Sequence, residues 1–235
     1  LIDWLKIYDE PLDVTTNVKD YSVKYVDGVY RLVAKNYVAQ IGEGESAQKF
    51  ESLQEAVSAC GTGTNTITLL ADCGEDVTIK QEEGVNVIID GDGFAYSGTF
   101  TIHGNARYEG AETLTFQNIN FVTDKAGHYF IDSNSTGSVE RYAHNVTVNN
   151  CNFKATGAGV NSAAAMRIRQ GFDIAIIGGT FTNLHSALQA YGNTGITVDG
   201  VTIEGGKNGI SAGTSTGVVI KNSTIDVTGY GVRAD

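Results

Sequence analysis

The feature that most constrains the fold is an internal repeat of 22 residues. VTIEGGKNGI at 201–210 returns as STIDVTGYGV at 223–232. Upstream, five segments share one pattern: LTFQNINF from Leu114, VTVNNCNF from Val146, IAIIGGTF from Ile174, ITVDGVTI from Ile196 and VVIKNSTI from Val218. The first and third residues of each segment are apolar, which is the alternation of a β-strand. A repeat of this length without helix-length segments predicts a solenoid of stacked strands.

Two further positions of the repeat support this interpretation. The fifth residue of each segment tolerates a left-handed backbone and predicts a sharp bend: Asn118, Asn150, Gly178, Gly200 and Asn222. The eighth residue is apolar and predicts an interior column: Phe121, Phe153, Phe181, Ile203 and Ile225. A second strand follows at a fixed offset, in Met166-Arg167-Ile168, Leu188-Gln189-Ala190, Ile210-Ser211-Ala212 and Val232-Arg233-Ala234. One face of each strand is therefore expected to be buried and the other solvated.

These segments resemble the right-handed parallel β-helix repeat of the pectin-lyase-like superfamily, over roughly residues 50–235. The resemblance implies an all-β solenoid of coils of about 22 residues. It implies no single activity, because lyases, hydrolases, phage tailspikes and non-catalytic adhesins use this fold. The run IGEGESAQKFESLQEAVSAC…NTITLLADC also resembles an N-terminal module of large secreted or surface-attached bacterial proteins.

The amino-terminal part predicts a hairpin and a capping helix. SVKYV and VYRLVA flank Asp27-Gly28, a typical hairpin turn. KFESLQEAVSAC carries apolar residues on one helical face and predicts a helix at about 47–60 that covers the first coil. Ser52 and Glu55 form a capping-box pattern, although Ser46 and Glu51 are alternative helix starts. We therefore divide the chain into a hairpin and cap segment, 1–45, and a β-helix, 46–235, with coils at about 64–235.

Composition limits the partners. The 235 residues are 41% hydrophobic and 18% charged, with a formal charge of −11, which disfavours nucleic acid and anionic membranes because attraction to phosphate is missing. No apolar run approaches the roughly 18 residues of a membrane span. The chain begins with Leu and ends inside a copy of the repeat, so we expect a monomeric segment of a longer protein with further coils.

The cysteines and histidines predict no metal site and no cofactor. Cys60 and Cys73 are candidates for one disulfide, whereas Cys151 lies in an apolar strand pattern and is expected in the core. Asp90-Gly91-Asp92-Gly93 permits two interpretations, a tight turn or a calcium loop, and it lacks the further ligand spacing of the latter.

Function in a solenoid usually lies where the repeat is broken. First strands begin 32, 28, 22 and 22 residues apart, so the early coils carry longer loops, at 103–113 and 132–145. These loops are expected side by side and form the first candidate binding patch: Arg107, Tyr108, Arg141, Tyr142 and His144. Arg and Tyr are enriched in recognition hot spots. The alternative is an ordinary loop surface with Tyr packed against the solenoid wall.

The second candidate patch lies on the outer face of the second strands: Arg167, Arg169, Gln189 and Tyr191. Two adjacent outward arginines in an acidic chain suggest an acidic partner or a sugar that bears a carboxylate. The alternative is structural, because Asp132 is expected one coil earlier and pairs Arg167.

Catalysis is the weaker hypothesis. Inverting glycoside hydrolysis needs two carboxylates, but the outward column of the first strands holds only Asp199. Asn193-Thr194-Gly195 lacks the Asp of the hydrolase pattern, and Arg167-Ile168-Arg169 only faintly resembles the RxK pattern. We therefore predict a non-catalytic, adhesin-like segment, extracellular or on a bacterial cell surface. It recognises a host glycan or host protein, such as a secreted glycoprotein or an immunoglobulin. The alternative is a polysaccharide lyase or glycoside hydrolase that acts on an acidic polysaccharide.

Overall fold

The computed structural model describes residues 15–104, 110–133 and 142–234, and it divides the chain into two compact units, Leu1–Tyr37 and Val38–Asp235. The described part of the first unit is an antiparallel hairpin of β1 (Tyr21–Val26) and β2 (Val29–Ala34). Its turn is formed by Asp27 and Gly28, with φ of 50° and 79°. Both values are left-handed, as the two-residue turn requires, so the predicted hairpin is confirmed.

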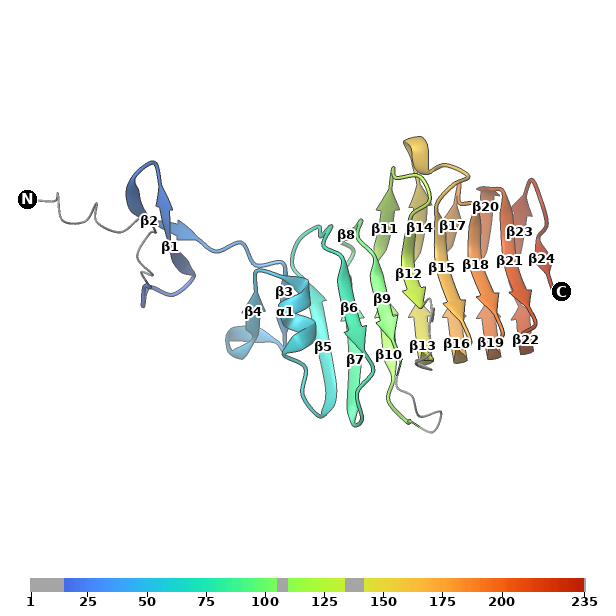
Figure 1. Ribbon diagram of the computed structural model, residues 1–235, viewed down its shortest axis with the longest axis horizontal. Coiled ribbons are helices and arrows are strands. Elements are labelled where there is room, and N and C mark those ends of the chain that lie inside the picture. Colours follow the sequence, from blue (N-terminus) through green and yellow to red (C-terminus); the bar gives the residue numbers. More distant parts are fainter. Residues whose placement is uncertain (1–14, 105–109, 134–141, 235) are drawn as a thin grey trace, which may run out of the picture. The chain divides into compact units, whose positions relative to one another are not determined.

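Within the described residues, the second unit consists of three sheets that run side by side along its coils (Figure 1). The nine-stranded sheet has the order β22 (Thr216–Lys221), β19 (Thr194–Asp199), β16 (Phe172–Ile177), β13 (His144–Asn149), β10 (Leu114–Gln117), β7 (Val85–Asp90), β5 (Gly63–Leu69), β3 (Ala39–Ile41) and β4 (Gln48–Phe50). The six-stranded sheet has the order β23 (Thr224–Val227), β20 (Thr202–Gly206), β17 (Thr180–Thr182), β14 (Asn152–Ala155), β11 (Asn120–Thr123) and β8 (Ala95–Tyr96). The seven-stranded sheet has the order β24 (Val232–Arg233), β21 (Asn208–Gly213), β18 (Ser186–Tyr191), β15 (Ala164–Arg169), β12 (Tyr129–Ser133), β9 (Phe100–His103) and β6 (Val77–Lys80).

Strand pairing reproduces the sequence repeat. Ile174 pairs with Ile196 and Ile196 with Val218, each 22 residues apart, in parallel register. Met166, Leu188, Ile210 and Val232 follow one another in the same way across the seven-stranded sheet. From β7 onward, each coil therefore contributes one strand to each sheet, which confirms the predicted parallel β-helix. The other strands of the second unit pair in parallel, whereas β3 pairs antiparallel with both β4 and β5.

The bends between sheets occupy the predicted positions. Asn118, Asn150 and Asn222 have φ of 54°, 50° and 52°, and Gly178 and Gly200 have φ of 63° and 68°. Asn150 Nδ2 donates to Asn118 Oδ1 at 3.1 Å, and Asn118 Nδ2 donates to Asp90 Oδ1 at 3.2 Å. The side chains of the bends thus form a hydrogen-bonded ladder from coil to coil, so Asn here supplies both the backbone conformation and a contact.

Aromatic side chains stack through the interior. Phe121, Phe153 and Phe181 are paired in register and at most 1% exposed. The rings of Phe121 and Phe153 are 4.3 Å apart and those of Phe153 and Phe181 are 4.8 Å apart, both close to parallel. This separation matches the spacing of neighbouring strands, so the repeat places like rings directly above one another.

The capping helix α1 (Leu53–Ser58) is shorter than the predicted 47–60. Gln48–Phe50 instead forms β4, because its backbone pairs with β3. Ser52 is the N-cap, and its hydroxyl accepts from Glu55 N at 3.3 Å, as the capping-box pattern predicts. The side chain of Glu75 accepts from Leu53 N at 2.8 Å and from Ser52 Oγ at 2.7 Å, so a neighbouring coil also caps the helix.

The boundary between the two units lies at Tyr37 and Val38 rather than at 45 and 46, because β3 belongs to the nine-stranded sheet. Cys60, Cys73 and Cys151 are free thiols, so the candidate disulfide is absent. Cys151 is 1% exposed, as predicted, and burial raises the pKa of its thiol to about 12. No helix within the described residues is long and apolar enough to cross a membrane.

Candidate functional site

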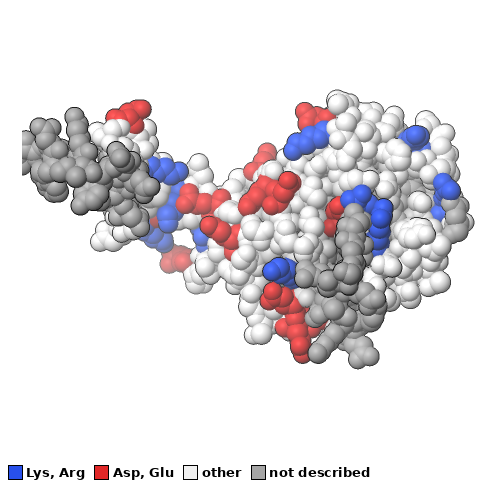
Figure 2. All heavy atoms as spheres, viewed as in Figure 1, with Lys and Arg blue, Asp and Glu red and all other residues white. Residues whose placement is uncertain are grey.

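A groove of about 430 Å³ lies on the outer face of β15, β18 and β21. Arg167 and Arg169 of β15, Gln189 and Tyr191 of β18, and Ser211 of β21 line it. We call it the outer groove. All four residues of the second predicted patch meet here, because Arg167 pairs with Gln189 and Arg169 with Tyr191 in the parallel register. In Figure 2 this sheet faces the reader. Basic side chains lie near the middle of the face, and few acidic ones lie toward the carboxyl end of the chain.

Arg167 is bound by the preceding coil. Its Nε donates to Asp132 Oδ1 at 2.8 Å and its Nη2 to Asp132 Oδ2 at 2.6 Å, a bidentate ion pair. The guanidinium carbon also lies 4.1 Å from the centre of the Tyr129 ring. These contacts raise the pKa of Arg167 above its usual value, chiefly through the hydrogen bonds to Asp132. The structural interpretation therefore holds for Arg167: its charge is compensated, and its side chain forms a fixed wall of the groove.

Arg169 and Tyr191 are the accessible members of the predicted patch. Arg169 is exposed, and no described residue forms an ion pair or hydrogen bond with its guanidinium. Tyr191 is 59% exposed. A β-carbon on Gly213, which follows Tyr191 in register, would lie 3.2 Å from Tyr191 Cδ2, so the ring lies across this glycine. The groove thus offers an uncompensated cation beside an open aromatic ring.

Five residues that line the groove were not predicted: His185, Ser186, Ala190, Ser211 and Tyr230. His185 Nδ1 lies 3.1 Å from Ser186 Oγ, and Gln189 Nε2 donates to the same oxygen at 3.5 Å. Burial, and then the nearby Lys207, lower the pKa of His185, so it is neutral at pH 7. Tyr230 lies at the far end, with Arg233 5.5 Å from its ring centre. The sequence could have indicated Tyr230, because it lies in STIDVTGYGV two residues before Val232, which begins the last of the aligned second strands.

The first predicted patch is described only at its base. Arg107, Tyr108 and Arg141 lie outside the described residues. Tyr142 and His144 are 8% and 3% exposed, so neither offers a surface to a partner, and the alternative of a Tyr packed against the wall fits Tyr142. The two loops do meet at their bases, because Asn145 Nδ2 donates to Gly110 O at 2.9 Å.

A buried polar cluster joins these loop bases to an earlier coil. Gln81 Nε2 donates to His144 O at 2.6 Å, and Gln81 Oε1 accepts from His144 N at 3.0 Å. His144 Nε2 lies 3.5 Å from Glu112 Oε2, and Glu112 Oε1 accepts from Gly84 N at 2.9 Å. The hydrogen bond from Gly84 is the main cause that lowers the pKa of Glu112. The cluster fixes the ends of the loops and is closed to solvent.

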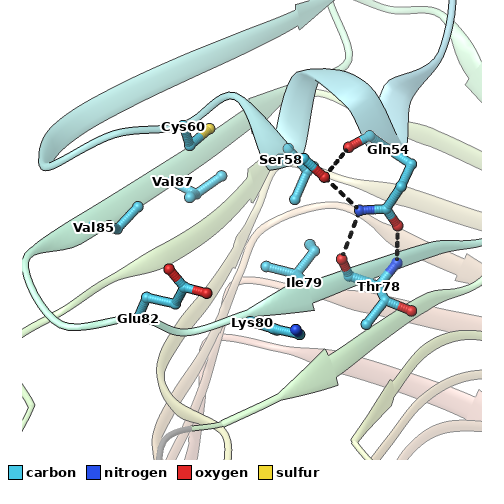
Figure 3. Close-up of a pocket in the computed structure, with 10 residues that line it drawn as sticks. Gln54, Ser58, Cys60, Thr78, Ile79, Lys80, Glu82, Val85 and Val87 are labelled. Carbon is cyan, nitrogen blue, oxygen red and sulfur yellow. Dashed lines mark hydrogen bonds between the residues drawn. The ribbon is translucent and has the colours of Figure 1, made fainter.

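A second cleft, of about 310 Å³, separates α1 from β6 and β7 (Figure 3). Gln54 crosses it: its Oε1 accepts from Thr78 N at 2.7 Å and its Nε2 donates to Thr78 O at 3.1 Å. Val85, Val87 and Ile79 form its apolar side. Burial raises the pKa of the Cys60 thiol at its edge, so this thiol is protonated at pH 7. These contacts attach the helical cap to the first coils.

The motifs considered for catalysis have structural roles. Asp90 accepts from Gln117 Nε2 at 2.7 Å, Asn118 Nδ2 at 3.2 Å and Asp92 N at 3.0 Å, which is the tight-turn interpretation of its motif. Asn193 is 1% exposed; its Oδ1 accepts from Gly171 N and its Nδ2 donates to Ile168 O, at 2.6 and 2.9 Å. Within the described residues, no group of three or more His, Cys, Asp or Glu side chains is arranged to hold a metal ion.

Comparison with known proteins identifies the fold. A family model described as a right-handed β-helix region matches residues 108–235, which is more than half of the chain. Neither a search of curated proteins nor one of solved structures gave a match. The matched segment begins before β10 and contains every coil that forms the outer groove. The parallel register of these coils and the family match agree, and the chain belongs to the right-handed β-helix family.

Proposed function

We propose that this chain is a non-catalytic recognition segment of a secreted or cell-surface bacterial protein, and that the outer groove binds a host glycan or host protein. One observation carries the proposal: Arg169, Gln189 and Tyr191 project from rigid, fully paired strands into one groove. Because strand pairing fixes the backbone that carries these side chains, only side-chain freedom is lost when a ligand binds. The exposed aromatic ring and the unpaired guanidinium are the two groups most enriched at binding hot spots.

The test is a binding screen with matched variants. The chain is applied to an array of host glycans and secreted host proteins, and each ligand found is then tested against Tyr191→Ala and Gln189→Ala. We expect at least one ligand whose affinity falls about tenfold or more in Tyr191→Ala, the usual effect of removing a hot-spot aromatic residue. Thr197→Ala on the nine-stranded sheet is the control and is expected to bind normally. Ligands that bind Tyr191→Ala and the parent chain equally would remove the outer groove from the proposal.

The alternative is a lyase or hydrolase for acidic polysaccharides, and it is favoured by the neutral His185 beside two arginines. A general base needs a pKa near the working pH. Against it, the groove has no carboxylate among the described residues that line it. Incubation with polygalacturonate and alginate, with and without calcium, is expected to give no unsaturated product and no new reducing ends. Product formation that Arg169→Ala abolishes would establish the enzyme and contradict the binding proposal.

A further inference from the structure

Two arginines of β15, Arg167 and Arg169, line the outer groove but have different roles. Arg167 already holds a carboxylate, that of Asp132, in a bidentate pair across two coils. Arg169 lies two residues further along β15, where its side chain leaves the same face, and has no such partner among the described residues. The planar guanidinium of Arg matches a carboxylate with two parallel hydrogen bonds. The Asp132–Arg167 pair shows that this face accommodates that geometry.

The charge around Arg169 favours an anion. Among the described residues, the groove is lined by two arginines and no Asp or Glu, although the whole chain has a formal charge of −11. Since Asp132 compensates Arg167, the net positive charge of the groove is that of Arg169 at pH 7, when His185 is neutral. A monovalent anion therefore fits the site electrostatically.

The remaining surface favours a sugar over a peptide. β18 is hydrogen-bonded to β15 on one side and to β21 on the other, so the groove has no free strand edge to which an extended peptide could add. Its described lining includes the hydroxyl of Ser211 and the amide of Gln189, and Ala190 is its one aliphatic residue, so it offers no apolar pocket for a side-chain anchor. The open face of Tyr191 provides an amphipathic surface beside these polar groups.

From these observations we infer that the outer groove binds a saccharide that bears a carboxylate. Arg169 pairs with the carboxylate, the ring of Tyr191 contacts the sugar, and the polar groups of Gln189 and Ser211 bind its hydroxyls. Two steps between strands, each about 4.8 Å, separate β15 from β21, so the groove takes a terminal sugar or a short oligomer rather than a long chain. This inference rests on the proposed function and names the ligand class for the same groove.

The test uses two acidic probes, each with a neutral counterpart of nearly the same shape. Tri-galacturonate and 3′-sialyllactose are each compared with the methyl ester of their carboxylates, by isothermal titration calorimetry on the 235-residue chain. We expect binding of at least one acid and at least about tenfold weaker binding of its neutral counterpart. The neutral probe cannot form the charge-assisted hydrogen bonds that a carboxylate forms with Arg169. Which acid binds distinguishes a uronic acid from a sialic acid as the source of the carboxylate.

Variants assign the contact to Arg169. Arg169→Ala is expected to reduce affinity about tenfold or more. Arg169→Lys is expected to reduce it less, because lysine keeps the charge but cannot donate two parallel hydrogen bonds to a carboxylate. Lys154→Ala on β14 removes one exposed positive charge from another sheet and is the matched control, with unchanged affinity. Unchanged melting of Arg169→Ala shows that its fold is intact.

Four outcomes would overturn the inference. Equal binding of an acid and its neutral counterpart excludes carboxylate recognition, and affinity for the acids that falls equally in Lys154→Ala excludes a specific role for Arg169. If none of the four probes binds while a ligand from the array depends on Tyr191, the proposed function stands and the acidic saccharide is wrong. A ligand independent of Tyr191 would instead remove the groove from both proposals.

Discussion

At the scale of single residues, the Asp132–Arg167 pair should contribute to stability as well as to the shape of the groove. Both side chains are about four-fifths buried, at 21% and 18% exposure, and Arg167 also lies over Tyr129. Arg167→Ala is therefore expected to lower the free energy of unfolding by about 1–2 kcal/mol, between the values for exposed and fully buried pairs. Urea denaturation measures the change. Arg169→Ala is the control on the same strand, and an equal loss there would contradict the distinction between the two arginines.

Two histidines predict a loss of stability on mild acidification. Burial is the main cause that lowers the folded-state pKa of both His128 and His185 below their ordinary value of 6.5. The unfolded chain therefore binds more protons as the pH falls through 6.5, and stability decreases until the pH lies below the folded-state values. Melting temperature is expected to fall between pH 7.5 and 5.5, where the carboxylates stay ionised.

The double variant His128→Gln and His185→Gln removes both titrating groups and provides the control. Its melting temperature is expected to change less over the same pH range. A parent chain whose melting temperature is constant from pH 7.5 to 5.5 would contradict the assignment.

At the scale of the structural element, the asparagine ladder predicts a graded response at Asn150. Asn150 has φ of 50° and donates to Asn118. Asn150→Ala loses the hydrogen bond and also the polar side chain that lets Asn tolerate a left-handed backbone better than Ala does, which together cost about 1–2 kcal/mol. Asn150→Gly loses only the hydrogen bond, and its freedom at positive φ limits the cost to about 1 kcal/mol. If urea denaturation gives Asn150→Gly a lower free energy of unfolding than Asn150→Ala, backbone strain is not the dominant effect.

The repeat made the coils predictable, because each position in it has one physical role. Asn118 and its counterparts were assigned to bends, Phe121 and its counterparts to the interior, and Arg167 and Gln189 to the outer face, and the structure confirms each. These assignments depend on alternation and backbone conformation, which are local. The same alternation assigned Arg167, Arg169, Gln189 and Tyr191 to one outer face, but it predicted a patch there and not a groove.

Features that depend on contacts distant in sequence were not predictable in this way. The helical pattern at 47–60 did not reveal that Gln48–Phe50 pairs with β3, nor that Glu75 caps α1. The exposure expected for His144 was wrong because Gln81, 63 residues earlier, holds its backbone in the interior. Tyr230 and His185 join the groove through bends whose directions the alternation does not give.

At the scale of the whole molecule, stability should vary from coil to coil. Each coil contacts only its neighbours, so the strands β22, β23 and β24 have one described neighbour each. Their interior-facing Val218, Ile220 and Ile225 are only partly buried, whereas Ile196, Val198 and Ile203 one coil earlier are at most 2% exposed. Amides of β22–β24 are expected to exchange with deuterium faster than those of β16–β18, because local opening there exposes less apolar surface. Mass spectrometry of peptic fragments measures this, and uniform protection would contradict it.

The constant coil length also means that each regular coil extends the solenoid by the same distance. Every 22 residues in the regular coils advance the structure by one strand spacing, about 4.8 Å, and return each side chain to the same direction. Removing residues 174–195 would join Asp173 to Ile196 in the original register and place Gly213, in place of Tyr191, beside Arg169. Whole coils are thus interchangeable spacers. A surface built on them can be lengthened, shortened or emptied of a recognition group in fixed steps while the scaffold keeps its geometry.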